Sequence, residues 1–300
     1  MYDVLIVGSG PAGMTAAIYA ARINLKVCVL EKSAPGGAMV NTSKIENYPG
    51  YSSIDGATLS MNMFEQMMGL GIDFVGDDCQ EIIKEGETFK VVTSFGSYES
   101  KTVIYATGTR HKKLNVTNEE KFSGYGISWC AVCDGSFYKE KDICVVGGGN
   151  SALEEAIYLA NIVNKVYLIH RRDSFRADPI IINELKEKAN VEFVLNSQIV
   201  EFIGDKKLEK VLVKNINTNE ERLIEVEGCF EFVGQDPSNE PLKNLDVINE
   251  KGYVLVDSQL ETKVKGLFAA GDIIDKDVRQ IVTAVNDGAI AALGASRYCK

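Results

Sequence analysis

Two cysteines separated by two residues stand out as the pair best suited to redox chemistry. Cys130-Ala131-Val132-Cys133 can form a small disulfide ring when Cys130 opens a helix. A helix N-terminus lowers the pKa of a thiol placed there, which favours thiol–disulfide exchange. Asp134 follows directly, and a carboxyl group at that position can deliver or remove a proton as the ring opens and closes. An aspartate in a first helical turn also suits the helix dipole, so both explanations of Asp134 stay open.

A zinc site is the main alternative for the cysteine pair, but it requires four ligands. The sequence has no second Cys-x-x-Cys, and His111 and His170 lack a matching spacing, so we expect no metal. The other five cysteines are scattered. Cys28 and Cys144 lie within apolar runs, which is typical of buried, inert thiols. Trp129, just before Cys130, can cover the pair, meet a partner protein or pack in the interior.

Two glycine-rich turns predict the elements that would bring electrons to the cysteines. Each turn follows an apolar strand, at residues 2–7 and 142–146. Each is followed by a helical run, at 14–22 and 153–161, and by another strand, at 26–30 and 165–169. The arrangement is typical of βαβ units that hold a dinucleotide pyrophosphate at a helix N-terminus. The turns read Gly8-Ser9-Gly10-Pro11-Ala12-Gly13 and Gly147-Gly148-Gly149-Asn150-Ser151-Ala152.

The six positions of each turn have separate expected roles. The first glycine allows the tight bend, and the second lets the backbone approach a pyrophosphate. The last small residue, Gly13 or Ala152, keeps the helix close to the sheet. A single turn of this kind can exist without a ligand. Two copies in the same context favour two bound dinucleotides.

The residue that ends the second strand of each unit distinguishes the two dinucleotides. Glu31 lies 23 residues after Gly8, and His170 lies 23 residues after Gly147. A carboxylate accepts hydrogen bonds from a ribose 2′-OH and repels a 2′-phosphate, so the first site suits FAD or NAD. Three guanidinium groups after the second strand can hold a 2′-phosphate, which selects NADP unless the segment is only a solvated basic turn. They belong to Arg171, Arg172 and Arg176.

A third segment bears on the first site. Residues 266–272 read as a strand that ends in Asp272, and residues 281–289 read as a helix. An aspartate at such a strand end can bond the ribityl hydroxyls of a flavin, and the following helix can direct its N-terminus toward the ring. The composition alone does not prove a flavin.

Length and composition set the remaining limits. The 300 residues are enough for two domains, with 45% hydrophobic and 25% charged residues. A net charge of −10 argues against a nucleic-acid binder. Met1 runs directly into an apolar strand, and no apolar stretch is long enough to span a bilayer. We therefore expect a cytoplasmic protein with neither a nucleic-acid nor a membrane partner.

The motifs together resemble those of low-molecular-weight, bacterial-type thioredoxin reductases, a class of pyridine nucleotide-disulfide oxidoreductases. The resemblance covers nearly the whole chain, and the order of the motifs separates it from the larger glutathione-reductase type. The matching segments are both glycine turns, residues 45–50, Ala106-Thr107-Gly108, Cys130 to Gly135, His170 to Arg176, and Gly266 to Asp272 with Arg279-Gln280.

The resemblance implies an α/β protein with two Rossmann-like dinucleotide-binding domains, each a three-layer ββα arrangement. The NADPH domain, at about 114–239, is inserted into an FAD domain formed by about 1–113 and 240–300, and the protein is a homodimer. Expected FAD contacts are Gly8, Gly10, Pro11, Ala12, Gly13, Glu31, Lys32, Gly36, Gly37, Ala38, Asn47, Gly108, Gly271, Asp272, Arg279, Gln280 and Ile281. Expected NADPH contacts are Gly147, Gly149, Asn150, Ser151, Ala152, His170, Arg171, Arg172 and Arg176.

The same resemblance implies the activity and its sequence of steps. NADPH reduces the flavin, the flavin reduces the Cys130–Cys133 disulfide, and the dithiol reduces thioredoxin. Cys133 is then the sulfur nearer the flavin, Cys130 attacks the acceptor, and Asp134 transfers the proton. Both the nicotinamide and the cysteines must reach one flavin face, which implies a rotation between the domains.

Two departures from the family pattern and three alternatives accompany this expectation. Gly36-Gly37-Ala38 stands where relatives commonly have Gly-Gly-Gln, so one contact to FAD is missing, and Tyr125 stands where a basic residue is often found. The alternatives are a flavoprotein that reduces a different disulfide protein, one coupled to ferredoxin, and a non-catalytic FAD/NADP-binding sensor. The intact cysteine pair argues against the sensor.

Overall fold

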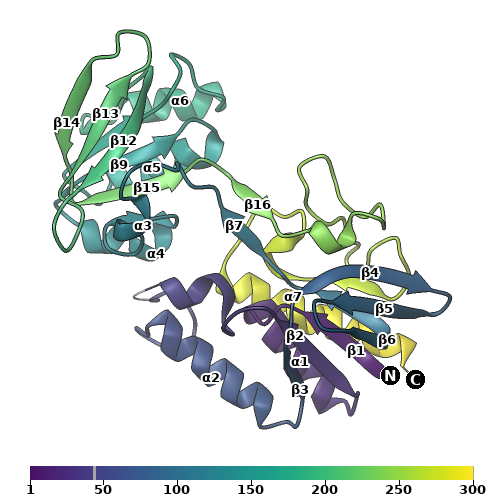
Figure 1. Cartoon of the computed structure of the whole chain (residues 1–300). Helices are drawn as coiled ribbons and strands as arrows, with labels where there is room; N and C mark the ends of the chain where they lie inside the picture. Colours follow the sequence, from purple (N-terminus) through teal and green to yellow (C-terminus); the bar gives the residue numbers. More distant parts are fainter. Residues whose placement is uncertain (43–44, 300) are drawn as a thin grey trace. The chain divides into compact units, whose positions relative to one another are not determined.

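The chain folds into two compact units, which are shown in a computed structural model that describes residues 1–42 and 45–299. The terminal unit consists of residues 1–110 and 236–300, and the inserted unit of residues 111–235 (Figure 1). The chain therefore crosses three and four residues earlier than the boundaries at 113 and 239 expected from the sequence. The chain passes between the two units in two short strands, β7 (Thr109–His111) and β16 (Gln235–Pro237). These strands pair with each other, so both boundaries between the units lie within them.

The terminal unit is built on a sheet whose central strands are parallel. Their order is β3 (Asp73–Gly76), β2 (Val27–Glu31), β1 (Tyr2–Val7), β6 (Ser97–Tyr105) and β17 (Leu267–Ala269). The first half of β6 also pairs antiparallel with β5 (Thr88–Thr93), which pairs with β4 (Cys79–Glu85). Strand β6 thus joins a parallel half and an antiparallel half.

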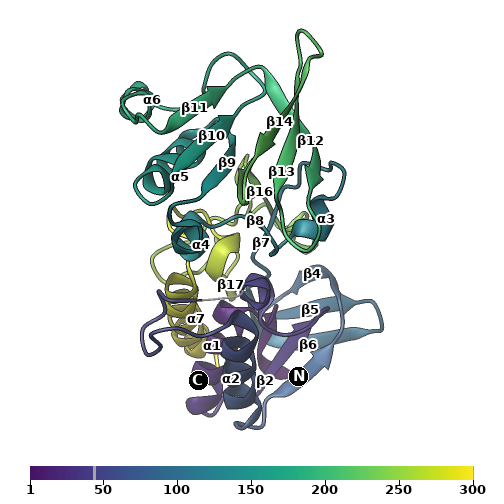
Figure 2. The same cartoon turned by 90° about the vertical axis from the view of Figure 1, so that its left-hand side faces the viewer.

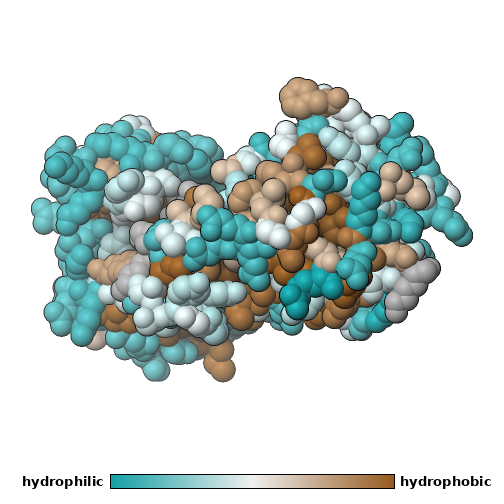
Figure 3. All heavy atoms as spheres, turned by 90° about the horizontal axis from the view of Figure 1, so that it is seen from below, coloured by the Kyte–Doolittle hydropathy of each residue, from teal (hydrophilic) through white to brown (hydrophobic). Residues whose placement is uncertain are grey.

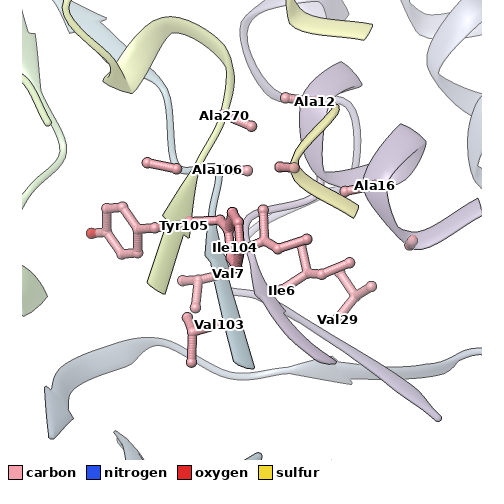
Figure 4. Close-up of a cluster of buried hydrophobic side chains, with 14 of the residues drawn as sticks. Ile6, Val7, Ala12, Ala16, Val29, Val103, Ile104, Tyr105, Ala106 and Ala270 are labelled. Atoms are coloured by element: carbon pink, nitrogen blue, oxygen red, sulfur yellow. The ribbon is translucent and has the colours of Figure 1, made fainter. Parts of the chain in front are cut away.

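Helices α1 (Pro11–Arg22), α2 (Gly56–Met68) and α7 (Ile281–Ala295) cover the parallel part of this sheet, with α1 packed against both others (Figure 2). Small residues permit this packing, because a side chain at Gly288 of α7 would overlap the backbone of Ala12 in α1. Apolar residues of β1, β2 and β6 fill the space beneath, among them Ile6, Val29 and Ile104 (Figure 4). Burial on both faces explains their near-continuous apolar sequences.

The inserted unit has three layers. A parallel sheet lies in the middle, in the order β11 (Val191–Val194), β10 (Lys165–Ile169), β9 (Asp142–Gly147), β15 (Gly228–Phe232) and β8 (Ile127–Ser128). Helices α5 (Asn150–Ala160) and α6 (Pro179–Lys186) pack on one face. The antiparallel sheet of β12 (Ser197–Ile203), β13 (Lys210–Asn215) and β14 (Glu221–Glu225) packs on the other.

Alternation along the strands divides the interior of the inserted unit into two cores. On β9, Ile143 and Val145 pack with the helices, whereas Cys144 and Val146 pack with the antiparallel sheet. This is the side-chain period of two expected for a strand. The short elements of the chain are η1 (Gly37–Asn41), α3 (Glu119–Phe122), α4 (Ala131–Asp134), η2 (Gly135–Tyr138), η3 (Glu240–Leu242), η4 (Gly271–Ile273) and η5 (Ser296–Tyr298).

The predicted α/β class with two Rossmann-like units is confirmed, and most differences are at element ends. Helix α1 begins at Pro11 instead of residue 14, because proline suits the first helical position. The strand predicted over 266–272 is shorter, since the chain turns at Gly271, where φ is +81°. Helix α7 runs six residues beyond the predicted 289, to Ala295. None of the helices in the described ranges is long and apolar enough to cross a membrane.

Candidate functional site

The cysteine pair forms the predicted ring at the start of a helix. Cys130 and Cys133 are joined by a disulfide, with their Cα atoms 5.3 Å apart. Cys130 is the N-cap of α4, and its Sγ accepts a hydrogen bond from the Cys133 backbone N–H at 3.2 Å. Val132, between them, is 48% exposed.

Asp134 is held beside the disulfide by a serine that also contacts the cysteine backbone. The Ser128 hydroxyl donates to Asp134 Oδ2 at 2.6 Å and accepts the Cys130 backbone N–H at 3.1 Å. Asp134 Oδ1 is buried and has no hydrogen-bond partner among the described residues. Burial raises the pKa of Asp134, and the Ser128 hydrogen bond opposes that rise. The carboxyl group can therefore hold a proton next to Cys133.

Trp129 packs against protein groups instead of standing free. Its indole stacks on the His111 ring, with centroids 5.5 Å apart, and its Nε1 donates to Glu231 Oε2 at 3.1 Å. Sequence reasoning missed Glu231. The available signal was a carboxylate in the middle of an otherwise apolar strand, Gly228-Cys229-Phe230-Glu231-Phe232.

The remaining thiols are unsuited to exchange. Cys28 and Cys144 are fully buried, as predicted, and so is Cys229. Burial raises the pKa of the Cys28 thiol to about 11 and that of Cys79 to about 12. Within residues 1–42 and 45–299, three or more His, Cys, Asp or Glu side chains nowhere come together in a way that could hold a metal ion.

The first glycine turn leaves one open position in front of α1. Gly8 has φ +100°, and a Cβ there would stand 2.5 Å from the Ala106 carbonyl oxygen. A Cβ at Gly13 would overlap the Gly8 carbonyl. At Gly10, the nearest atom to an added Cβ is Gly37 Cα, 4.0 Å away. The backbone at Gly10 is thus open to a ligand at the helix N-terminus.

Hydrogen bonds to Ser9 fix the residues around this turn in place. Glu31 accepts from the Ser9 N–H and hydroxyl at 2.8 and 3.0 Å, and from the Ser33 N–H at 2.8 Å. A carboxylate offers about four acceptor positions, so room for one ribose hydroxyl remains. The Gly36 N–H bonds the Ser9 carbonyl at 2.9 Å and brings Gly37 beside Gly10.

Three of the residues expected to contact FAD have surroundings that differ from those of the other expected contacts. Lys32 is exposed and lies 3.7 Å from Asp78 Oδ1, so its ammonium group is directed to another side chain. Ala38 is exposed at η1 and offers no polar group. Gly108 has φ +65° and open space around its Cα, and its carbonyl accepts the Ser238 N–H at 3.2 Å.

The segment that precedes α7 gathers distant residues. Gln280, the N-cap of α7, accepts a hydrogen bond from Asn47 Nδ2 at 3.1 Å, across 233 residues of sequence. The Arg279 guanidinium lies over the Tyr253 ring, 4.4 Å from its centroid. Ile281 is the first residue of α7. The predicted residues of this segment therefore lie together at one helix N-terminus.

Asp272 presents the clearest test of fit for a flavin. Its Oδ1 is buried without a hydrogen-bond partner among the described residues, although Lys276 Nζ lies 3.7 Å away. Burial raises the pKa of this carboxyl group. Neighbouring Gly271 donates its N–H to Asp287 Oδ2 at 3.2 Å. A buried acceptor without a donor is rare in a finished site, and a hydroxyl group of a bound ligand could supply the missing donor.

The second glycine turn is joined directly to the arginine segment. The Arg176 backbone N–H bonds the Gly148 carbonyl at 2.7 Å. Gly147 bends beside Ala152, and a Cβ at Gly149 would meet nothing within 4 Å. Asn150 exchanges two hydrogen bonds with Asp178, at 2.9 and 2.8 Å, while Ser151 starts the exposed side of α5.

The strand end of the second unit is basic. Among the described residues, Arg171, Arg172 and Arg176 form no ion pair, and two of them are exposed. His170 stacks on Phe175 at 5.2 Å and its ring lies against Gly148. Burial lowers the pKa of His170, so the imidazole is neutral and the guanidinium groups supply the charge.

The predicted residues therefore form two groups, one in each unit. The terminal unit contains the first glycine turn, Glu31, Asp272 and the start of α7. The inserted unit contains the second glycine turn, the arginine segment and the disulfide.

The chain is similar to known proteins over nearly its whole length. The family described as pyridine nucleotide-disulphide oxidoreductase matches residues 2–288. Thioredoxin reductase of Bacillus subtilis (strain 168) is 43% identical over 300 residues, covering 99% of this chain and 95% of its own. Thioredoxin reductase of Ureaplasma parvum serovar 3 is 43% identical over 299 residues, covering 99% and 97%.

A solved structure supports the same likeness. The crystal structure of thioredoxin reductase from Streptococcus pyogenes MGAS5005 has a TM-score of 0.96 and 44% identity, covering 100% of this chain and 98% of its own.

Proposed function

Because the chain belongs to the pyridine nucleotide-disulphide oxidoreductase family, within which it groups with thioredoxin reductases, we propose that it uses NADPH and FAD to reduce oxidised thioredoxin. The observation that carries the proposal is the Cys130–Cys133 disulfide at the start of α4, with the buried Asp134 carboxyl group beside it. This is the arrangement that thiol–disulfide exchange requires.

The terminal unit would hold FAD. The open backbone at Gly10 and the N-terminus of α1 suit the pyrophosphate, and Glu31 suits the adenosine ribose. The partnerless Asp272 Oδ1 suits the ribityl chain. When bound, a flavin supplies a two-electron carrier between a nicotinamide and a disulfide. The side chains named here bind and orient it.

The inserted unit would hold NADPH. The open backbone at Gly149 and the start of α5 suit the pyrophosphate. The three arginines suit a 2′-phosphate, because guanidinium groups form charge-assisted bonds to phosphate oxygens. Because His170 is neutral, the charge that would attract this phosphate comes from the arginines.

The chain's own sulfurs and carboxyl group would complete the reaction. In the dithiol state, the Cys130 thiolate attacks one sulfur of the acceptor disulfide and displaces the other as a thiolate. The Cys133 thiolate then attacks Cys130 Sγ, which re-forms the ring and releases the acceptor as a dithiol. Asp134 accepts a proton from a thiol before attack, or donates one to a leaving thiolate. The exposed Val132 lies on the side from which the acceptor would approach.

We also propose a cytoplasmic homodimer without nucleic-acid or membrane partners. Apolar side chains reach the surface in patches between hydrophilic ones (Figure 3). On α1 and α2 and at the C-cap of α1, several large ones are at least 40% exposed, and these are Tyr19, Met61, Met68 and Ile23. A second copy would cover them. The rotation of one domain against the other, expected from the resemblance, remains part of this proposal; locking it with an engineered disulfide should stop turnover.

The test measures the reduction of a chromogenic disulfide with NADPH or NADH, with and without thioredoxin. The purified protein should be yellow, lose its colour on addition of NADPH, and regain it with oxidised thioredoxin. Cys130→Ser and Cys133→Ser should each abolish reduction of thioredoxin. Full-speed reduction by either variant would overturn the proposal. Reduction of other disulfide proteins but not thioredoxin would identify a different acceptor, and colourless protein that cannot take up FAD would favour a sensor.

A further inference from the structure

Glu231 occupies a core position that an apolar residue normally fills. Along β15, Phe230 and Phe232 pack with α5, whereas Cys229 packs in the opposite core. Alternation places Glu231 on the same face as Cys229, beneath the antiparallel sheet, where it is 2% exposed. Burying a carboxyl group in such a place is costly unless it is paired or protonated.

The contacts of Glu231 connect it to the redox centre. Its Oε2 accepts the Trp129 indole N–H at 3.1 Å, and Trp129 immediately precedes Cys130. Its Oε1 is buried without a hydrogen-bond partner among the described residues. Strand pairing reinforces the connection, because Phe230, the neighbour of Glu231, is in register with Ser128, the neighbour of Trp129.

A second buried carboxyl group faces Glu231. Glu119 on α3 is 4% exposed and accepts the backbone N–H groups of Leu114, Asn115 and Val116 at 2.9, 2.6 and 3.2 Å. Three such donors hold the Glu119 carboxyl group in place. Burial and the facing Glu119 together raise the pKa of Glu231 to about 8.

Other charged or titratable groups around Glu231 do not neutralise it. Lys113 is the cation that acts on it, but its ammonium group pairs with exposed Glu120. His111 stacks on the far side of Trp129, and burial lowers its pKa, so it is neutral. Cys229, on the same strand, is fully buried and its pKa is raised, so it stays a thiol. The protonation state of Glu231 therefore sets the local charge.

We propose that Glu231 is a positioning residue of the redox centre: its buried carboxyl group anchors the Trp129 indole between His111 and β15, and its ionisation against the facing Glu119 shifts this anchor and slows the disulfide step. The hydrogen bond between Glu231 and Trp129 is an observation of geometry. The expected effect on turnover rests on the proposed function.

The neutral and ionised forms of the group differ in what they can do. A neutral carboxyl group can accept from the indole with one oxygen and donate toward Glu119 with the other. Once ionised it faces Glu119 as a like charge in a buried space, and the pair must separate or admit water. The new negative charge beside Trp129 also opposes formation of the Cys130 thiolate that attacks the acceptor.

Trp129 is the sole tryptophan of the chain, so its fluorescence reports directly on this contact. The experiment measures tryptophan emission of the FAD-loaded enzyme against pH. In the wild type we expect one transition with a midpoint near pH 8, the pKa of Glu231. Glu231→Gln keeps the acceptor and the donor but cannot ionise, so its emission should not titrate there. The matched control is Glu225→Gln, at an exposed glutamate on β14, which should titrate like the wild type.

Kinetics provide the second readout. In the wild type, kcat with a disulfide acceptor should fall about tenfold above the Glu231 transition, with the acceptor KM nearly unchanged, and Glu231→Gln should lack that fall. Glu231→Leu removes the acceptor for the indole, and kcat should drop at every pH; if this variant does not fold, the Gln variant still decides the question.

The outcomes separate this inference from the proposed function. A Glu231→Gln emission curve that titrates like the wild type would overturn the positioning role, even if Cys130→Ser abolishes thioredoxin reduction. A wild-type kcat that is flat through the transition would overturn the effect on the disulfide step. Loss of the transition in Glu231→Gln together with full activity of Cys130→Ser would leave the anchor standing and remove the proposed function.

Discussion

Asp134 and Asp272 each keep one buried oxygen without a hydrogen-bond partner among the described residues, and both carboxyl groups have a raised pKa. The physical cause is the same, since burial disfavours the ionised form. The consequences differ with position. Asp134 stands beside two sulfurs and is suited to proton transfer, whereas Asp272 stands in η4, just after β17, and is suited to accept a ligand hydroxyl.

Ser128 offers a direct way to change the proton affinity of Asp134. Its hydroxyl bonds the ionised carboxylate and thereby lowers the pKa of Asp134. We expect Ser128→Ala to raise that pKa further and to move the acid limb of the pH–kcat profile to higher pH, because a hydrogen bond to the ionised form is lost. Asp134→Asn should lower kcat by about 10²- to 10⁴-fold and remove the limb.

The control for this pair is Ser136→Ala, at an exposed serine in η2. Its pH profile should match the wild type. A Ser128→Ala profile that superimposes on that control would show that the hydroxyl does not tune Asp134.

At the scale of elements, two glycines where β1 joins α1 have different roles: one is needed for folding and the other for ligand binding. Gly13 and Gly10 are three residues apart, but a Cβ at Gly13 overlaps the Gly8 carbonyl, whereas one at Gly10 reaches open space. Alanine would improve the helix propensity of α1 at Gly13 by about 1 kcal/mol, yet forcing atoms into a packed site costs about 1–3 kcal/mol. The overlap is with backbone, which cannot move aside, so the cost should dominate.

We therefore expect opposite results from two similar substitutions. Gly13→Ala should lower the free energy of unfolding by about 1–2 kcal/mol. Gly10→Ala should leave the melting temperature of the flavin-free protein unchanged and lower its affinity for FAD. Denaturation and the flavin absorbance retained per chain measure the two effects. Equal flavin content in Gly10→Ala and the wild type would contradict a pyrophosphate at this turn.

The segment between β10 and α6 gives a prediction about cofactor choice. A backbone hydrogen bond from Arg176 to Gly148 fixes this segment at the second glycine turn. Arg171→Gln and Arg176→Gln should each raise the KM for NADPH about 10- to 100-fold, as expected for the loss of a charge-assisted bond of about 1.5–3 kcal/mol. The KM for NADH should stay unchanged.

Lys186→Gln, which removes an exposed cation at the end of α6, serves as the control for charge alone. If it raises the KM for NADPH as much as the arginine variants do, the effect is a general one of electrostatics and not a contact with the 2′-phosphate.

At the scale of the whole molecule, the exposed apolar side chains of α1 and α2 bear on assembly. Met61 on α2 is 52% exposed. A carboxylate placed in a buried apolar interface is strongly unfavourable. If the proposed dimer uses this surface, Met61→Asp should shift it to monomer in sedimentation experiments. Phe95→Asp, at an 88% exposed residue between β5 and β6, should not. A dimer that resists Met61→Asp would place the interface elsewhere.

The sequence alone determined the parts of the site that are contiguous in the chain. The two glycine turns, the arginine segment and the Cys130–Cys133 ring are each set by a few neighbouring residues, and local backbone geometry suffices to predict them. The α/β class followed from alternating strands and helices, because such a pattern requires a parallel sheet.

Only the tertiary structure decided which distant residues meet. Trp129 and Glu231 are 102 residues apart, and Asn47 and Gln280 are 233 residues apart. Their contacts depend on the strand orders of two sheets, and that of Glu231 also depends on which face of β15 its side chain occupies. Register and strand order arise from the packing of whole layers, which no local stretch of sequence encodes. For that reason Glu231 became visible only in the folded chain.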